Sequence, residues 1–295
     1  MRGELANTGL SSFRVFGNMV EKLNTFRELA VSMGPVFGVM SEGIAENIEF
    51  VGAFQKGLGI ANEEMKAFGE LAIRTGKPIQ EVMRETANYT IQLGKQFGIS
   101  QKLLGKDIAK MVKDVAHFGS TTTKKMAEAA VYVRKLGLEI DQLGGTLDKY
   151  DNFETAAEGV AEFARVFGVN VDVFALTQAE DGAERLDMMR KAFLAAGHDA
   201  QKLSRVELKL LADAAGFTDV AAAKLAFSAE NVGTSLKDVG KEADKATKKQ
   251  LTQEEAMSKL ADSIERMVKQ GQFYEGGFFA HFFKGFEIGL KRSRD

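Results

Sequence analysis

The sequence predicts an all-α protein: a multi-helix array of short helices joined by Gly corners, with a C-terminal amphipathic helix and a Phe-rich tail. Two observations predict this fold class. The 295 residues are rich in strong helix formers and include only two prolines, as expected of a chain with few forced helix breaks. In addition, one short pattern, a large apolar residue followed by Gly, recurs along the chain.

The recurring pattern indicates the end of one helix and the start of the next. Gly adopts the left-handed backbone conformation at low cost, so it commonly follows the last helical residue. The apolar residue after it packs back on the finished helix, a role predicted for Ile60, Ile99, Leu138 and Val169. Polar residues nearby can cap the next helix, and the predicted caps are Asn62, Ser100, Ser120 and Asn170. The predicted helix-corner residues are Gly59, Gly98, Gly119, Gly137 and Gly168.

The first four helices are predicted from apolar residues at three- and four-residue spacing. They cover residues 9–33, 41–57, 62–76 and 78–97. Gly34 and Pro35 end the first helix, because Pro cannot continue a helix interior. Pro78 instead occupies a first-turn position, where its missing N–H is tolerated.

Helical patterns continue as far as residue 227. A single apolar stripe predicts a helix over 100–118, a further helix covers 121–136, and 138–151 is less regular. Helices are then predicted over 152–167, 171–181, 182–197, 208–216 and 218–227. Ser204 and Glu207 have the spacing of a capping box, in which each side chain binds the other residue's backbone N–H. This box opens the helix that continues through 208–216.

Composition divides the chain into four predicted parts: an N-terminal helix (1–34), a helical body (35–228), a polar linker (229–251) and a C-terminal segment (252–295). Residues 229–251 combine few apolar residues with dense mixed charge, which is typical of a solvated helix or a linker. A second capping box, Thr252 and Glu255, opens an amphipathic helix. Its stripe is two heptads long, which does not distinguish a coiled coil from a helix on a neighbouring surface; it comprises Met257, Leu260, Ile264 and Met267.

The end of the C-terminal segment is unusually apolar. Six phenylalanines fall within 14 residues, and a basic tip follows. An apolar segment of this kind is expected to be shielded from water by contact with another surface. We expect it to bind a partner protein; packing on the helical body and contact with a membrane surface are the alternatives. The residues of this partner-binding hypothesis are Phe273, Phe278, Phe279, Phe282, Phe283 and Phe286.

The sequence offers no recognisable catalytic pattern. Cys is absent, which excludes disulfides, thiolate zinc sites and a cysteine nucleophile. The Gly-Lys dipeptides lack the remainder of a phosphate-binding loop, and no apolar run reaches the length of a signal-peptide core or a membrane-spanning helix. No metal-binding spacing links the three histidines, His117, His198 and His281. We interpret three acidic residues as solvated carboxylates: Asp141, Asp148 and Asp151.

These observations predict a non-enzymatic protein. No catalytic residue, cofactor or metal site is expected. The formal charge of −2 gives no indication of sequence-specific nucleic-acid binding either. A string of helices with an apolar tail is instead typical of a structural or interaction role.

Three segments resemble helical regions of virion structural proteins of tailed phages, most closely tail tape measure proteins of contractile-tailed phages. They are LGIANEEMKAFGELAIRTGKPIQEVM, QFGISQKLLGKDIAKMVKDVAHFG and AEFARVFGVNVDVFALTQAEDGAERLDMMRKAFLAAG. The resemblance is one of overall sequence character and extends over residues 35–270. No catalytic or metal motif takes part in it.

The resemblance implies a mostly helical protein that is made in the host cytoplasm and held in the virion tail, where it sets tail length and is released at infection. It implies contacts with other tail or baseplate proteins and a homo-oligomer. Such proteins are usually longer and rod-like, whereas frequent corners favour a compact bundle; a fragment, a domain or another virion protein therefore also fits. The alternative function is a helical adaptor or chaperone-like module that binds a partner through its Phe-rich C-terminus.

Overall fold

The computed structural model describes residues 19–231 and 233–269, and in these ranges it is helical without any strand. This confirms the predicted all-α fold class. The six phenylalanines of the C-terminal tail and the first ten residues of the helix predicted over 9–33 lie outside the described residues. Their predicted roles therefore stay predictions.

The α-helices of the first half are α2 (Met19–Met33), α3 (Pro35–Glu46), α4 (Ile48–Leu58), α5 (Asn62–Thr75), α6 (Ile79–Phe97), α7 (Gln101–Lys113), α8 (Val115–Phe118) and α9 (Thr123–Lys135). Those that follow are α10 (Gly144–Lys149), α11 (Phe153–Phe167), α12 (Val173–Gln178), α13 (Gly182–Ala195), α14 (Arg205–Ala215), α15 (Val220–Ala226), α16 (Leu236–Lys248) and α17 (Gln253–Lys269). Short 3-10 helices are η1 (Ile140–Leu143), η2 (Ala200–Lys202) and η3 (Ala229–Asn231).

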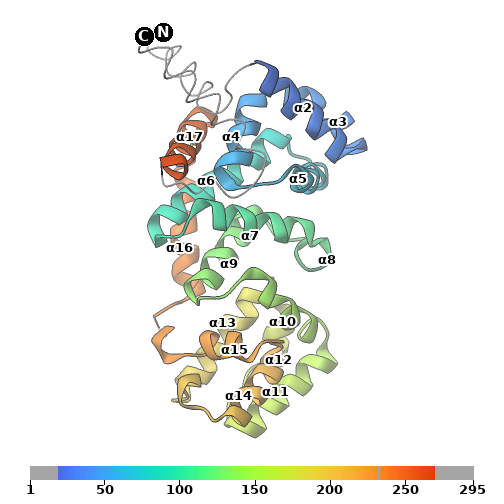
Figure 1. The fold of residues 1–295 in the computed structure, drawn as a ribbon. Helices are drawn as coiled ribbons and strands as arrows, with labels where there is room; N and C mark the ends of the chain where they lie inside the picture. The colour runs from blue at the N-terminus through green and yellow to red at the C-terminus, as the bar shows by residue number, and fades with distance from the viewer. Residues whose placement is uncertain (1–18, 232, 270–295) are drawn as a thin grey trace.

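The helices stack into an elongated body (Figure 1). Helices α2 to α5 lie at one end, α7, α9 and α16 cross the middle, and α11, α12 and α14 lie at the other end. Helix α6 is central to the first half, where α3, α4, α5, α7, α9, α16 and α17 all contact it. Its buried threonines, Thr86 and Thr90, donate their hydroxyl hydrogens to carbonyl oxygens one turn back. A helix surrounded in this way can therefore carry hydroxyls in the core without leaving them unpaired.

Residues 236–248, inside the segment predicted to be a solvated helix or a linker, form helix α16, and one face of this helix is buried. Val239, Ala243 and Ala246 are buried against α6 and α9. They are spaced four and three residues apart, so they form one narrow face of a helix whose other faces are charged. Two of the three are alanines, which explains why the segment has so little apolar content. The chain therefore returns to the first half after residue 228 instead of leaving the body.

Polar side chains of α6 hold the end of α16 and the residues after it. Asn88 is 2% exposed; its amide donates to the Ala246 carbonyl at 3.1 Å and accepts the Leu251 N–H at 3.1 Å. Tyr89 hydroxyl lies 3.0 Å from the Thr247 hydroxyl. Gln92 donates to the Lys249 carbonyl at 2.7 Å. Backbone groups that would otherwise be unpaired at the α16 terminus thus find partners on α6.

Helix α17 begins at the predicted capping box and packs on α4 and α6. The Glu255 N–H donates to the Thr252 hydroxyl at 3.1 Å, and the Thr252 N–H donates to the Glu255 carboxylate at 2.9 Å. The predicted stripe is confirmed, since its four residues are buried. Close packing depends on Gly57 of α4, because a Cβ there would lie 2.8 Å from Leu260.

The predicted glycine corners have two different structures. Gly59, Gly98, Gly137 and Gly168 have φ of 69°, 67°, 77° and 66°, in the left-handed region that ends a helix at Gly. Gly119 differs, with φ of −59°. A Cβ at Gly119 would lie 2.4 Å from the Val115 carbonyl oxygen, so close backbone approach, not positive φ, favours Gly there.

The helix caps differ from the prediction. Thr122 and Asp172, two residues beyond the predicted Ser120 and Asn170, accept backbone N–H groups at the starts of α9 and α12. Ser100 occupies the N-cap position of α7 without a side-chain cap bond. The Asn62 side chain instead accepts from Gln55 at 2.8 Å. Polar residues cluster in each corner, and the sequence pattern does not decide which of them has cap geometry.

Two predicted helices are each divided into two. Asn47 separates α3 from α4, and its side chain donates to the Gly43 carbonyl at 2.8 Å. Asp114 separates α7 from α8 and caps α8 by accepting the His117 N–H. Short polar side chains of this type bind nearby backbone groups in competition with the helix.

We predict that Asn88→Ala lowers the free energy of unfolding by about 1–3 kcal/mol, because the buried Leu251 N–H loses its partner and the Ala246 carbonyl keeps only the longer bond from Gln92, at 3.3 Å. Gln250→Ala is the control; Gln250 accepts only an exposed hydrogen bond from Arg84 at 3.1 Å, so its loss should change stability by less than about 0.5 kcal/mol. Urea denaturation of both variants measures the difference. Equal, small effects would contradict the inferred attachment of α16 to α6.

Candidate functional site

Among residues 19–231 and 233–269, no group of three His, Asp or Glu side chains is arranged to hold a metal ion. Within the same ranges, no helix has the length and apolar character needed to cross a bilayer. Three other features of the described residues are candidate sites. They are a histidine held between two carboxylates, a basic hollow beside α17, and apolar surfaces at the two ends of the body.

His117 lies between two aspartates from different helices. Its Nδ1 is 2.7 Å from Asp114 and its Nε2 is 2.9 Å from Asp148 on α10. Hydrogen bonding to Asp114 raises the pKa of His117, and the bond to Asp148 adds to this, while burial partly opposes it. Both nitrogens donate when the ring is protonated, so the imidazolium satisfies both carboxylates. Because neither ring nitrogen is then free to accept a proton, His117 is suited to bridging α8 and α10 rather than to acting as a catalytic base.

The acidic residues near the His117 bridge are exposed but have partners. Asp148 is bound by His117, and Asp141 forms an ion pair with Lys110 of α7. Asp151 lies 4.0 Å from the buried Arg185 guanidinium. The interpretation of Asp141 and Asp148 as solvated carboxylates is therefore incomplete, because each also joins α10 or η1 to the helices before it. No local spacing in the sequence indicates this contact, because 31 residues separate His117 from Asp148.

The buried charges of the second half serve the fold. Arg190 is 1% exposed and donates to the Tyr132 hydroxyl at 2.7 Å and the Asn231 carbonyl at 3.0 Å. Tyr132 in turn donates to Asp187 at 2.9 Å. Because these groups bind one another and backbone carbonyls, they leave no open functional group for a ligand.

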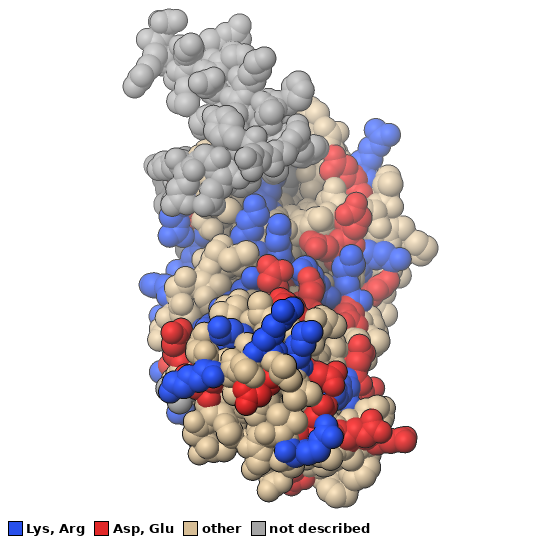
Figure 2. Space-filling view, turned by 60° about the horizontal axis from the view of Figure 1, so that its bottom comes forward, with Lys and Arg blue, Asp and Glu red and all other residues tan. Residues whose placement is uncertain are grey.

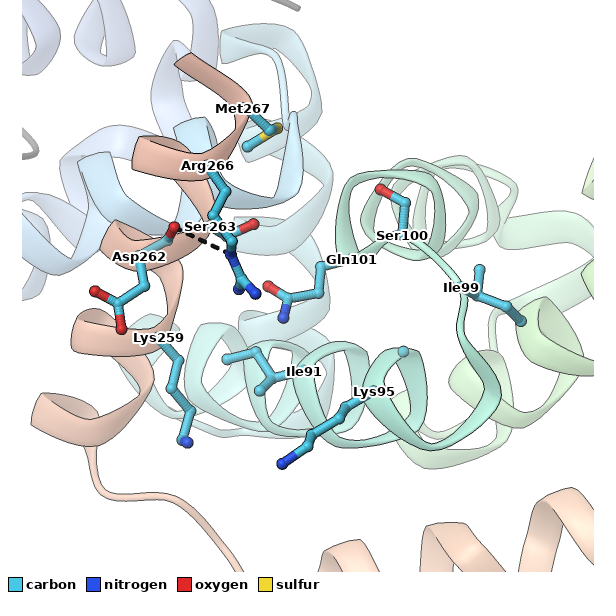
Figure 3. A pocket seen from close by; sticks show the side chains of 11 residues that line it. Ile91, Lys95, Ile99, Ser100, Gln101, Lys259, Asp262, Ser263, Arg266 and Met267 are labelled. Atoms are coloured by element: carbon cyan, nitrogen blue, oxygen red, sulfur yellow. Dashed lines mark hydrogen bonds between the residues drawn. The ribbon is translucent and has the colours of Figure 1, made fainter. Parts of the chain in front are cut away.

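The second candidate is a hollow of about 560 Å³ between α6, the corner after it, the start of α7, and α17 (Figure 3). Lys95, Lys259, Arg266 and Asp262 line this space. Figure 3 also shows the amide of Gln101 facing the Arg266 guanidinium across it. Gly98 forms the adjoining corner, so the predicted left-handed turn places α7 at the wall of the hollow.

Apolar side chains are exposed at the two ends of the body. At the first end, Met19, Val20, Leu23, Val31 and Val39 of α2 and α3 are between 62% and 78% exposed. At the other end, the rings of Phe153 and Phe174, on α11 and α12, are 52% and 64% exposed and pack together with centroids 5.1 Å apart.

Charged side chains of both signs are interspersed over the face shown in Figure 2, with uncharged surface between them. No helix pattern in the sequence distinguished these exposed apolar residues from the buried ones. Several of them, including Val20 and Leu23, belong to the apolar spacing from which the first helix is predicted. Periodicity predicts a helix but not whether its apolar face is covered by the same chain.

Comparisons with known proteins give no match: no family model, curated protein or solved structure is similar to this chain at a significant level. No activity or binding site is transferred from a relative. Function therefore has to be inferred from the residues and surfaces described above.

We predict that His117→Gln destabilises the protein at about pH 5.5 and has no effect at about pH 9. The pKa of His117 is raised in the folded state, so its stabilisation is complete below the ordinary histidine pKa of about 6.5 and disappears as pH rises through the raised value. The loss should stay below about 1 kcal/mol because the ring is partly exposed. Thermal melts at both pH values measure it.

Asp148→Asn is the matched test of the bridge, since it removes one carboxylate and keeps the ring. Its effect should have the same sign and the same pH dependence as that of His117→Gln. A change in melting temperature that is equal at both pH values would contradict the ionic bridge between His117 and the two aspartates.

Proposed function

We propose that this chain is a non-enzymatic structural protein of a phage tail, of tape-measure type, located in the virion after synthesis in the host cytoplasm. It acts through helix–helix contacts with further copies and with other tail or baseplate proteins. The resemblance of its helical segments to such proteins supports this proposal. The observation that carries it is the pair of exposed apolar surfaces at opposite ends of an elongated helical body.

The aromatic end is suited to protein contact. Single exposed apolar residues are normal on soluble proteins, but Phe153 and Phe174 form a packed pair that is more than half exposed. Val206 of α14, at the same end of the body, is a further 68% exposed. Aromatic side chains of this kind often anchor interfaces, because they bury a large area at small entropic cost.

The aliphatic end differs from the aromatic end, so a contact between them is heterologous. Heterologous contacts that do not close into a ring generate open, head-to-tail assemblies. Such an assembly is elongated even when each subunit is compact. This reconciles short helices with a role along a tail, where one continuous rod is not required.

Mass spectrometry of purified particles tests the proposed location. Particles released from a culture that carries the gene are separated on a density gradient, and tail-containing fractions are compared with soluble fractions. The chain is expected to be enriched with tail proteins. Its absence from particles, with presence only in soluble complexes, would contradict the proposal and favour the adaptor alternative.

We predict that Phe153→Ser combined with Phe174→Ser weakens self-association of the purified full chain by on the order of tenfold or more, because two exposed rings no longer become buried. Sedimentation velocity over a concentration series measures this. The matched control is Leu103→Ser with Val115→Ser, two side chains 44% and 46% exposed on α7 and α8. An equal change in both double variants, or association unchanged in the phenylalanine variant, would contradict the end-to-end contact.

A further inference from the structure

The basic hollow beside α17 is separate from the apolar ends and is not used by the proposed assembly. Its volume of about 560 Å³ falls in the range of small-molecule sites, about 300–1,000 Å³. It is built by two segments distant in sequence: the end of α6 with the Gly98 corner and the first residue of α7, and helix α17. The shape of the hollow therefore depends on the return of the chain to α6.

The charges in the hollow are unbalanced. Lys95, Lys259 and Arg266 contribute three positive charges against the one negative charge of Asp262, a net charge of +2. Lys95 and Lys259 form no ion pair within the described part of the chain. The Arg266 guanidinium donates from Nε to the Asp262 backbone carbonyl at 3.3 Å, which leaves its terminal nitrogens directed into the space. An excess of cationic over anionic side chains at this site favours an anionic ligand.

Groups on the α7 side suit the same ligand. Helix α7 is 13 residues long, its N-cap residue Ser100 makes no side-chain cap bond, and Ser100 and Gln101 line the hollow. A helix N-terminus of this kind attracts phosphate through its dipole and N–H groups. The Oε1 atom of Gln101 is buried and has no hydrogen-bond partner.

Apolar side chains complete the wall. Ile91, Ile99 and Met267 line the hollow beside the basic groups. A site with an apolar wall and a few convergent polar groups is suited to an organic molecule rather than to an ion alone. We infer that the hollow binds a small organic phosphate, with its phosphates between Lys95, Lys259 and Arg266 and its organic part against the apolar wall.

Isothermal titration of the full chain with ATP, at low salt, tests this inference. ATP is the probe because it combines several phosphates with hydroxyls and an aromatic base. The wild-type chain is expected to bind it. The triple variant Lys95→Gln, Lys259→Gln and Arg266→Gln should lower the affinity by on the order of tenfold or more, since charge-assisted hydrogen bonds to phosphate are lost. Its unliganded melting curve should remain that of the wild type, because all three side chains are exposed.

A matched variant controls for net charge. Lys106→Gln, Arg205→Gln and Lys209→Gln also remove two lysines and one arginine from exposed positions, outside the hollow. This variant should keep the wild-type affinity within about twofold, because none of its three side chains lines the hollow. No ATP binding by the wild type, or equal losses in the two triple variants, would overturn the site.

Sodium tripolyphosphate distinguishes an organic phosphate from phosphate alone. ATP should bind at least several-fold more tightly, because only ATP has an organic part that contacts the apolar wall. Equal affinity for the two would overturn the organic part of the inference. Neither result depends on whether the chain is found in particles, so this site and the proposed tail function fail separately.

Discussion

The packing of both ends of the described chain around helix α6 is the constraint on which the rest of the structure depends. Helices α3 to α5 reach α6 from the N-terminal side, and α16 and α17 return to it from more than 150 residues further along. The return is specified by polar contacts as well as apolar ones, because Asn88 binds backbone groups on both sides of the turn between α16 and α17. With this return in place, α17 covers α4 and the basic hollow acquires its third wall. Helices α16 and α17 thereby complete the packing of the first half. The second half, from η1 to α15, is connected to the first half at both of its ends.

Buried charged side chains connect helices of this fold through directional hydrogen bonds, which the apolar core does not provide. Arg134 of α9 binds Asp107 of α7 through two hydrogen bonds of 2.7 and 2.8 Å. Burial raises the pKa of Asp107, and the contact with Arg134 opposes that shift, so the pair is best satisfied as ions. Arg190 fixes α13 to the chain between α15 and α16 in a comparable way, through carbonyls and the Tyr132 hydroxyl. Directional contacts of this kind are consistent with a rigid body whose two apolar ends keep a constant separation.

Much of the helical framework could be predicted from the sequence, because its signals are local. Apolar spacing and left-handed glycines depend on a few neighbouring residues, and Gly98 and Gly168 have the expected backbone conformation. Long-range features could not be predicted in this way. The burial of α16 rests on two alanines and a valine, whose small apolar content is masked by the surrounding charge. The basic hollow joins Lys95 to Arg266, and no spacing within the sequence indicates that these residues meet. Exposed and buried apolar residues on α2 share one periodicity, so the candidate contact surfaces emerged only from the packing.

The central claim is that α16 and α17 complete the core around α6 instead of forming a separate C-terminal part. Native-state hydrogen exchange of the full chain, resolved by residue, tests it most directly, because amides that open in one cooperative unit share one opening free energy. Amides of α16 and of the first turns of α17 are expected to exchange with the same opening free energy as those in the middle of α6. Rapid exchange of α16 and α17 while α6 stays fully protected would contradict it.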